Sequence, residues 1–316
     1  MSSKNPVRRA PHYVAPVDDA ALGAVDAVRV GEKKSNLWLD AWRDLRGRPM
    51  FWASLTMIVF ILFVALFPFL FTAEDPGYCQ LSLSNSGPVD GHPLGFNRQG
   101  CDVFARIVHG ASTSVQVGAI VTVMVFVMGV VMGGLAGFFG GWIDSVLMRI
   151  GDIFFAIPYI LAAVVIMSVF SGYRTVWVIS LAIGAFAWPS TARILRSEVL
   201  RVKQSDFVMA STALGVSRGR TLLTHVLPNS IAPVIVVTTI SLAAAITAEA
   251  TLSYLGVGLP RVFSWGNDIS QAQVDLRTAP QVLLYPSIAL SLTVLSFIML
   301  GETLRDALDP KARAQR

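Results

Sequence analysis

Charged residues are scarce in this chain of 316 residues. Lys, Arg, Asp and Glu together make up 14% of it, whereas soluble domains carry about 25%. Apolar residues make up 54%. This composition excludes an ordinary soluble domain and indicates a protein that crosses a membrane several times. The net charge of +5 comes without a basic module interleaved with aromatic residues, so nucleic acid is not an expected partner.

Motifs for catalysis and nucleotide binding are missing as well. The chain has no G-x-x-x-x-G-K-[ST] loop to hold a nucleotide phosphate, and no G-x-S-x-G, H-E-x-x-H or Cys-rich metal pattern. Proton-driven pumps need buried acidic or His relays, and Glu249 is the one candidate carboxylate near a span. We therefore expect no enzyme, no metal site and no cofactor bound by this chain. The energy for transport is expected to come from another protein.

Six apolar windows are long enough to cross a bilayer core, which takes roughly 20 helical residues. They fall at 50–72, 115–139, 152–170, 176–192, 231–250 and 281–301. The first begins too far into the chain, and is too long, for a signal peptide. The sequence therefore predicts an all-α polytopic membrane protein with six transmembrane helices.

Lys and Arg residues fall mainly on one side of these six crossings. Twenty of the 25 lie in residues 1–50, near Arg149, in 193–230 or after 301. Cytoplasmic loops carry the excess of positive charge. Both termini and the loop 193–230 are thus predicted to be cytoplasmic.

The crossings divide the chain into segments. They are a disordered cytoplasmic tail (1–35), an interfacial amphipathic helix (36–49), the first transmembrane helix with an extracytoplasmic loop (50–114), a five-helix core (115–301) that includes the loop 193–230, and a cytoplasmic tail (302–316). The amphipathic helix presents Trp38, Ala41, Trp42 and Leu45 on one face, which suits the membrane surface. A helix packed on the protein's own loops is the alternative.

Two smaller patterns lie in or next to the spans. Gly129, Gly133, Gly137 and Gly141 recur every four residues, which indicates a close contact between two helices or a flexible exit from the span. The only cysteines, Cys79 and Cys101, share the extracytoplasmic loop. That location favours a disulfide, which would stabilise the fold by roughly 3 kcal/mol; two free thiols are the alternative.

The loop between the fourth and fifth spans holds a short amphipathic pattern. Ser205 is placed to cap a helix, and Gly215 stands where a left-handed C-cap is needed. Asp206 lies in the first turn, where it suits the helix dipole, and the shared face comprises Phe207, Ala210, Ser211 and Leu214. So short a helix is not stable alone. It either docks into a groove of a soluble partner or packs against the chain's own spans.

Three blocks of the sequence resemble a known family. Met209, Ala210, Ser211 and Gly215, followed by His225, Leu227, Pro228 and Asn229, resemble the E-A-A-x-x-x-G and H-x-L-P-N pattern of the EAA loop, with Met209 in place of the family's Glu. The stretch 92–115 resembles H-P-L-G-T-D-x-x-G-R-D, with Phe96, Asn97 and Cys101 in place of Thr, Asp and Arg. Together with 249–269 and 304–310, these blocks resemble ABC importer permeases of the dipeptide/oligopeptide/nickel family, oligopeptide permease C type.

The resemblance implies a type I ABC importer transmembrane domain with a cytoplasmic coupling helix. It implies a bacterial plasma membrane location and three kinds of partner: a second permease subunit in a heterodimer, two cytoplasmic ATPase subunits that bind ATP and Mg, and an extracytoplasmic substrate-binding protein. Asp206, Phe207, Ala210, Ser211, Leu214 and Gly215 would then contact an ATPase. The expected cargo is di- or oligopeptides, with nickel or another small solute as the alternative.

Two positions and two further protein classes allow more than one interpretation. Glu249 either faces the translocation path or is a helix-end carboxylate bonded to neighbouring backbone. Trp265 and Gly266 either seat the binding protein or pack the loop. An ion-coupled secondary transporter would need internal repeats and broken helices at the midplane, and no repeat is evident. A membrane-anchored scaffold would leave the inner loop without a function.

Overall fold

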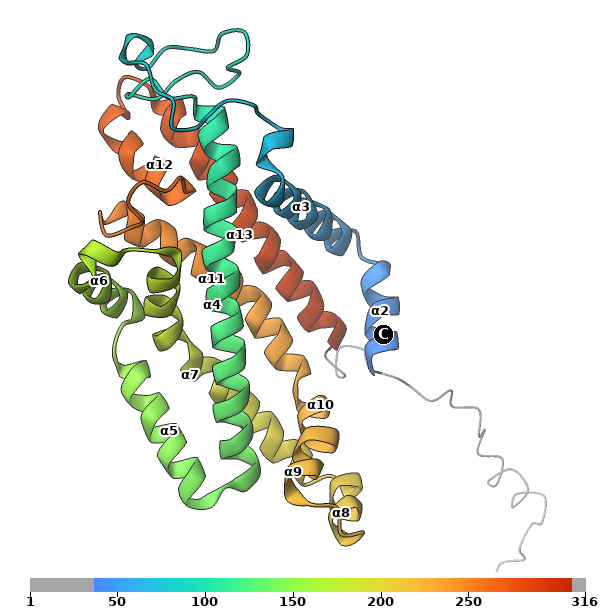
Figure 1. Cartoon of the computed structure of the whole chain (residues 1–316). Coiled ribbons are helices and arrows are strands. Elements are labelled where there is room, and N and C mark those ends of the chain that lie inside the picture. The colour runs from blue at the N-terminus through green and yellow to red at the C-terminus, as the bar shows by residue number, and fades with distance from the viewer. Residues whose placement is uncertain (1–36, 309–316) are drawn as a thin grey trace, which may run out of the picture.

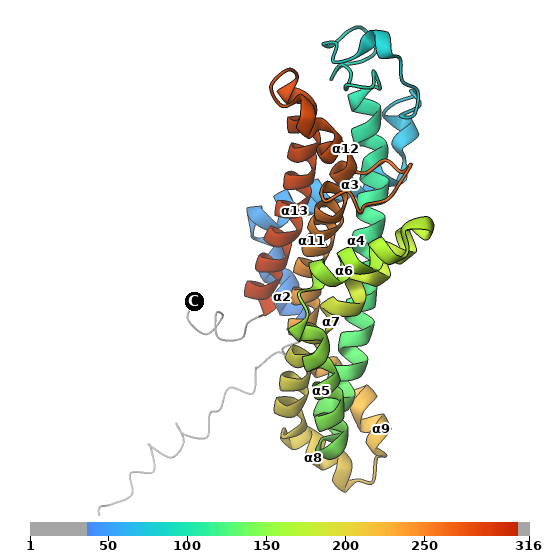
Figure 2. The ribbon, with the colours of Figure 1, turned by 90° about the vertical axis from the view of Figure 1, so that its left-hand side faces the viewer.

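The computed structural model describes residues 37–308. Within this range the chain is helical apart from loops and three isolated β-bridges. The predicted tail 1–35 lies outside the described residues. Figure 1 shows a long bundle in which one helix runs almost the whole height of the molecule, and the rotated view in Figure 2 shows the same length and a narrower profile.

Five helices are long and apolar enough to cross a membrane. They are α3 (Pro49–Leu66), α4 (Val103–Phe139), α7 (Val176–Lys203), α11 (Ala232–Tyr254) and α13 (Pro280–Leu308). The shorter elements are α2 (Leu37–Arg46), η1 (Pro68–Leu70), η2 (Leu81–Leu83), α5 (Gly141–Ala156), α6 (Tyr159–Val169), η3 (Ser171–Tyr173), α8 (Asp206–Ala213), α9 (Arg218–Thr221), the π-helical η4 (Leu222–Val226), α10 (Leu227–Ser230), α12 (Trp265–Ala272) and η5 (Gln273–Asp275).

The third predicted crossing, 152–170, is not one helix. α5 and α6 meet at Pro158 with a bend of 77°, and the described chain has six crossings only if this pair counts as one. A proline disfavours the helical conformation of the residue before it, which places the break at Ile157. Two Arg–Asp pairs hold α5 against α7: Arg196 with Asp144 at 2.5 Å, and Arg193 with Asp152 at 2.8 Å.

Three helices extend beyond the predicted apolar windows. α4 has 37 residues, which is about 55 Å at 1.5 Å per residue and well beyond a bilayer core of about 30 Å. α7 continues through its basic last turns to Lys203. α13 continues to Leu308, into the segment predicted as tail. Hydropathy detects only the stretch in lipid, so the polar extensions of these helices were not predicted.

The glycine pattern of α4 forms a close contact with α7. A methyl group on Gly129 would lie 2.6 Å from Cγ2 of Thr191, and one on Gly137 would lie 2.9 Å from the carbonyl oxygen of Arg196. Gly133 lies directly over the backbone of Ala192. The helix-contact alternative is confirmed for these three glycines. Gly141 is different: it begins α5 with φ at +58°, and a Cβ there would meet nothing within 4 Å.

The first helix, α2, packs partly on the chain itself. Ala41 and Leu45 are buried together with Phe51 of α3 and with Ala307 and Leu308 of α13. The two tryptophans predicted for the same face, Trp38 and Trp42, are about half exposed, at 46% and 49%. α2 therefore has one side packed on the chain, as one alternative predicts, and exposed tryptophans that suit a membrane surface, as the other requires. Its place at a membrane surface stays a prediction.

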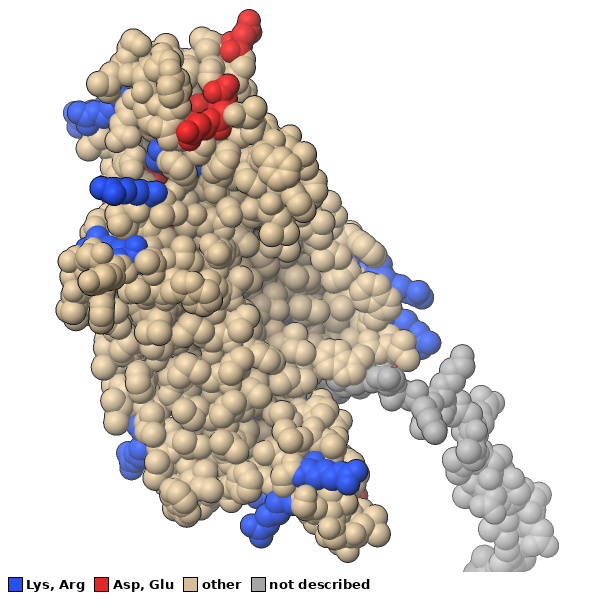
Figure 3. Space-filling view, in the orientation of Figure 1, with Lys and Arg blue, Asp and Glu red and all other residues tan. Residues whose placement is uncertain are grey.

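The two ends of the molecule carry the irregular structure. The loop 67–102 and α12 lie at one end, and α8 and α9 lie at the other, in both views (Figures 1 and 2). Figure 3 shows a wide uncharged area over the long helices, with charged side chains toward the ends and one edge. This distribution is what a membrane-spanning bundle requires, because charged groups are costly in the hydrocarbon core.

The contact between α4 and α7 generates a test with two matched substitutions. Gly133→Ala places a methyl against the backbone of Ala192, which cannot move aside as a side chain can. Overpacking of this kind costs about 1–3 kcal/mol. We expect a lower melting temperature of the purified protein in detergent, measured by intrinsic fluorescence.

The neighbouring residue supplies the control. A methyl on Gly134 would lie 3.7 Å from Leu227 and 3.8 Å from Leu195, which is ordinary van der Waals contact. Gly134→Ala is therefore expected to keep or raise the melting temperature, since Ala favours a helix over Gly by about 1 kcal/mol. Equal melting temperatures for the two variants would show that the contact is looser than described.

Candidate functional site

The short helix α8 ends at Ala213 with Leu214 as its C-cap, and Gly215 is the left-handed residue that follows, as the sequence predicts. Gly215 has φ at +81°, and its N–H donates to the carbonyl of Thr212 at 3.1 Å. The N–H of Val216 donates to the carbonyl of Ser211 at 3.2 Å. These two bonds make a Schellman motif. The left-handed residue reverses the chain directly after α8, so α8 ends in a defined turn.

The start of α8 differs from the prediction. Ser205 occupies the N-cap position, but its side chain makes no bond to the helix. Its hydroxyl donates instead to the carbonyl of Val202, in the last turn of α7, at 2.6 Å. Asp206 is exposed in the first turn of α8, where a negative charge suits the helix dipole. The hydroxyl of Ser205 thus joins the end of α7 to the start of α8.

α8 has one packed side and one open side. Val208 is 3% exposed and Ser211 is 7% exposed, and both face the bundle. Phe207 is 49% exposed and Leu214 is 84% exposed, with Ala210 also open to solvent. Ser211, predicted to share the contact face with Phe207 and Leu214, is thus packed on the chain itself, and its contact with an ATPase stays a prediction. The sequence left two alternatives, packing against the chain's own spans and docking into a partner. One side of α8 packs on the chain, and another side leaves apolar side chains free.

The packed side of α8 belongs to a cluster that joins five elements. The buried members are Phe138 of α4, Leu195, Val199 and Val202 of α7, Val208 of α8, Leu222 and Val226 of η4, and Val234 of α11. A polar contact reinforces it, since the ammonium of Lys203 donates to the carbonyl of Phe138 at 2.5 Å. Close-packed interiors transmit displacement. α8 is therefore connected through this cluster to three membrane-spanning helices, α4, α7 and α11.

Glu249 is fully buried between α4, α11 and α12, with 0% exposure. Its carboxylate accepts hydrogen bonds from the hydroxyls of Ser253 at 2.9 Å and Ser114 at 3.2 Å. Ser114 also accepts the backbone N–H of Trp265 at 3.3 Å. The partners of Glu249 are thus side-chain hydroxyls. A role in the translocation path would require α11 to separate from α4, and that role stays a prediction.

Trp265 and Gly266 lie inside this junction. Trp265 is 3% exposed, and its indole N–H donates to the carbonyl of Ile107 at 2.9 Å. A methyl on Gly266 would overlap Ala250 of α11. Both residues pack α12 against α4 and α11, as the packing alternative predicts, and neither is free to seat another protein in this conformation.

A buried ion pair fastens α12 to α4. Nε of Arg106 donates to Oδ1 of Asp268 at 2.7 Å, and Nη2 donates to the same oxygen. The side chains are 7% and 9% exposed. The guanidinium also lies 5.0 Å from the ring centre of Phe263 and 3.4 Å from the amide oxygen of Gln271. Burial raises the pKa of Asp268, and the charge of Arg106 opposes that shift.

This pair was not predicted from the sequence. Arg106 entered the charge count and the family-resemblance stretch 92–115, and Asp268 entered only the stretch 249–269. The two residues are 162 positions apart, so no local spacing connects them. The available signal is that Asp268 lies one turn after the capping residue Ser264 on a helix whose other positions are mostly uncharged.

The loop 67–102 is held by short-range polar contacts. The sulfur atoms of Cys79 and Cys101 lie at bonding distance, 2.03 Å, and the N–H of Gln80 donates to the carbonyl of Gly100 at 2.9 Å. Asp102 caps α4 by accepting the N–H of Phe104 at 2.7 Å. These contacts join residues 79–80 to residues 100–101, directly before α4 begins. Among residues 37–308, no three His, Cys, Asp or Glu side chains gather at a spacing that holds a metal ion.

Two family models match the chain. The model described as binding-protein-dependent transport system inner membrane component matches residues 129–314, and the N-terminal TM domain of oligopeptide transport permease C matches residues 36–88. The oligopeptide transport system permease protein OppC of Bacillus subtilis is 35% identical over 297 residues, which are 94% of this chain and 97% of that protein.

Further relatives extend the likeness. The dipeptide transport system permease protein DppC of Alkalihalophilus pseudofirmus is 35% identical over 88% of this chain and 91% of its own length. The glutathione transport system permease protein GsiD of Escherichia coli is 35% identical over 93% and 97%. A solved structure of the MetNI methionine ABC transporter in inward-facing conformations aligns with a TM-score of 0.50 and 20% identity, over 64% of this chain and 96% of that one. That likeness concerns the fold.

Removing one charge of the pair between Arg106 and Asp268 should destabilise the protein. Arg106→Met leaves the carboxylate of Asp268 buried without a counter-charge, which costs about 3–5 kcal/mol. We expect a clear drop in melting temperature. The double variant Arg106→Met/Asp268→Leu removes both charges and should recover most of the loss, since an apolar replacement of a buried pair is often neutral. A double variant as unstable as the single one would mean that packing, and not charge, accounts for the effect.

Proposed function

The chain belongs to the family of binding-protein-dependent transport system inner membrane components, and on that premise we propose that it is the membrane-spanning permease subunit of an ATP-driven importer of di- or oligopeptides. The relatives named for oligopeptide, dipeptide and glutathione transport share peptides as the named cargo. The family's dependence on a binding protein argues against an ion-coupled secondary transporter. Nickel, the alternative cargo from the sequence, has no support among these relatives.

The chain itself is proposed to be non-catalytic. Two separate cytoplasmic ATPases bind ATP and Mg, a second permease subunit completes the pore, and an extracytoplasmic protein delivers the peptide. The positive-inside distribution of Lys and Arg supports an orientation in which both termini and α8 face the cytoplasm. The loop 67–102 and α12 then face outward, the side on which an oxidising environment favours the bond between Cys79 and Cys101.

The observation that carries the coupling proposal is the open apolar face of α8. Phe207 and Leu214 expose large side chains, at 49% and 84%, on a helix whose opposite side is fixed in the five-element cluster. An amphipathic helix with one free apolar face suits a groove in a partner. Asp206, Ala210 and Gly215 are the remaining exposed residues of the proposed contact.

Movement of α8 is proposed to link ATP to the pore. When the two ATPases close on ATP, α8 is displaced as a rigid unit, and the cluster around Phe138, Val202 and Val234 carries the displacement to α4, α7 and α11. ATP shifts the conformational equilibrium only if the ATPases contact α8 differently in the two states. In this proposal the packed side of α8 passes the displacement to the membrane-spanning helices, and the open side makes the contacts that differ between the two states.

The double variant Phe207→Ser/Leu214→Ser tests this proposal. Both side chains are exposed, so the melting temperature of the isolated chain should not change. Uptake of a labelled tripeptide by proteoliposomes that contain all subunits should fall at least about tenfold, because each buried apolar side chain contributes about 1.5–3 kcal/mol at an interface. Co-purification of the ATPases is measured in parallel to separate lost docking from lost transmission.

Leu223 provides the matched control. It is 65% exposed on η4, within the same connection but outside α8. Leu223→Ser should leave uptake at the wild-type level. The coupling proposal fails if the α8 double variant transports normally, or if Leu223→Ser loses uptake to the same degree.

A further inference from the structure

A cavity of about 330 Å³ lies at the α12 end of the molecule. It is bounded by the loop 67–102, the first turns of α4, the helix α12 with η5, and the start of α13. Its size falls within the range of small-molecule sites, which begins near roughly 300 Å³. Glu249 does not line it. The cavity is thus separate both from the buried carboxylate at the α4–α11 junction and from the coupling face of α8, which lies at the other end of the bundle (Figure 1).

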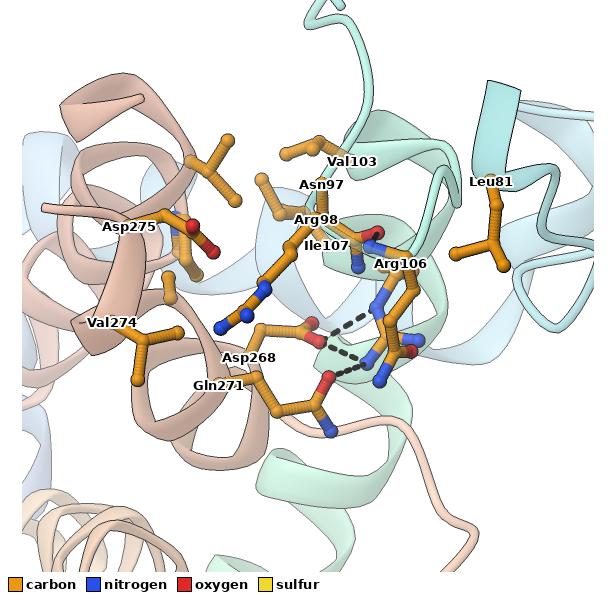
Figure 4. Close-up of a pocket in the computed structure, with 14 residues that line it drawn as sticks. Leu81, Asn97, Arg98, Val103, Arg106, Ile107, Asp268, Gln271, Val274 and Asp275 are labelled. Carbon is orange, nitrogen blue, oxygen red and sulfur yellow. Dashed lines mark hydrogen bonds and ion pairs between the residues drawn. The ribbon is translucent and has the colours of Figure 1, made fainter. Parts of the chain in front are cut away.

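One wall of the cavity is the ion pair of Arg106 and Asp268, drawn in Figure 4 with its hydrogen bonds. Both hydrogen bonds from Arg106 to Asp268 are accepted by Oδ1. The side chain of Asp268 is 9% exposed. Its other carboxylate oxygen, Oδ2, is buried and has no hydrogen-bond partner among the described residues. A buried carboxylate oxygen without a donor is costly. Because this oxygen has almost no accessible surface, a molecule in the cavity does not contact it, and Asp268 contributes the negative charge of its remaining surface to this wall.

The facing wall offers the opposite chemistry. Arg98 extends from the loop 67–102 toward α12 (Figure 4). Its guanidinium makes no ion pair or hydrogen bond among residues 37–308, whereas its backbone carbonyl accepts the hydroxyl of Ser84 at 2.7 Å, which fixes the chain at this position. An unpaired guanidinium beside a cavity is a natural receptor for a carboxylate, which it binds in a bidentate fashion.

The remaining lining sets the overall charge and polarity. Arg98, Arg106, Asp268 and Asp275 contribute two charges of each sign, so the cavity as a whole is neutral. The aliphatic side chains that complete it are Leu81, Val103, Ile107, Val274 and Val282. A strongly charged ligand has no net attraction here. A neutral molecule with one positive end, one negative end and a small apolar body between them complements the acidic, basic and aliphatic side chains of the lining.

We propose that this cavity binds a small zwitterion, a free amino acid or short peptide, with its ammonium beside the acidic side chains of Asp268 and Asp275 and its carboxylate on Arg98. The assignment comes from the lining residues alone and goes beyond the proposed function, since it gives the permease chain a ligand site of its own. Because binding needs neither ATP nor transport, the site can be tested even if the proposed coupling mechanism is wrong.

The experiment measures binding of trialanine to the full-length chain in lipid nanodiscs, with the subunits that co-purify and without nucleotide or added binding protein. Saturable binding at millimolar concentration or below is expected. N-acetyltrialanine lacks the ammonium and trialanine amide lacks the carboxylate. Each should bind at least about tenfold more weakly, because each leaves one charged wall group unpaired.

Two pairs of variants locate the site. Arg98→Gln removes the carboxylate receptor, and Arg277→Gln removes an exposed charge nearby that lines no part of the cavity. Val274→Trp fills the cavity without changing any charge, and Leu276→Trp makes the same change outside it. Val274 and Leu276 are both exposed, at 69% and 54%, so neither variant should disturb folding. Arg98→Gln and Val274→Trp should each weaken binding at least about tenfold, and the two controls should bind like the wild type.

The proposal is overturned if trialanine shows no saturable binding, if the blocked peptides bind as well as the free one, or if Val274→Trp binds like the wild type. Equal loss in Leu276→Trp also overturns it, since the ligand would then lie elsewhere. Peptide uptake by the complete transporter is measured separately. Uptake without trialanine binding to the chain rejects the cavity site alone, and binding without uptake rejects the transport function alone.

Discussion

The close approach of α4 and α7 is the constraint on which the rest of the structure depends. Between helices in lipid there is no hydrophobic driving force, so contact has to come from packing and from small residues that let backbones meet. Gly129, Gly133 and Gly137 provide this over about two turns. α4 then extends past the contact in both directions. Phe138 at one end joins the cluster that fixes α8, and Arg106 at the other end holds α12. α4 therefore positions both α8 and α12.

The sequence predicted those features that a local pattern determines. Apolar length located the spans, and the positive-φ requirement located the turn after α8 at Gly215. Features set by neighbours were not predictable in this way. Which side of α8 is packed depends on the cluster that Val208 forms with α7 and η4, and no local pattern shows that Ser211 is buried beside it. The bend at Ile157 was missed because a proline inside an apolar run is tolerated in some spans, such as Pro189 in α7, and breaks others.

The buried pair of Arg106 and Asp268 shows a second limit of sequence reasoning. Desolvation of two charges offsets most of their attraction, so such a pair is weak support for stability and better suited to fixing one arrangement. Here it sets the position of α12 against α4, together with the bond from Trp265 to Ile107. The same pair also forms part of the wall of the cavity beside α12. A single contact thus serves both the fold and the proposed ligand site.

The half-packed geometry of α8 suits the coupling role proposed for it. A helix buried on all sides would present nothing to an ATPase, and a helix free on all sides would transmit nothing to the pore. Val208 holds α8 in the five-element cluster while Leu214 remains 84% exposed. The bond from the hydroxyl of Ser205 to Val202 ties α8 to the last turn of α7, and α7 runs unbroken from there along the glycine contact with α4. In the proposed mechanism, a displacement applied at Leu214 is therefore carried to the interface between α4 and α7.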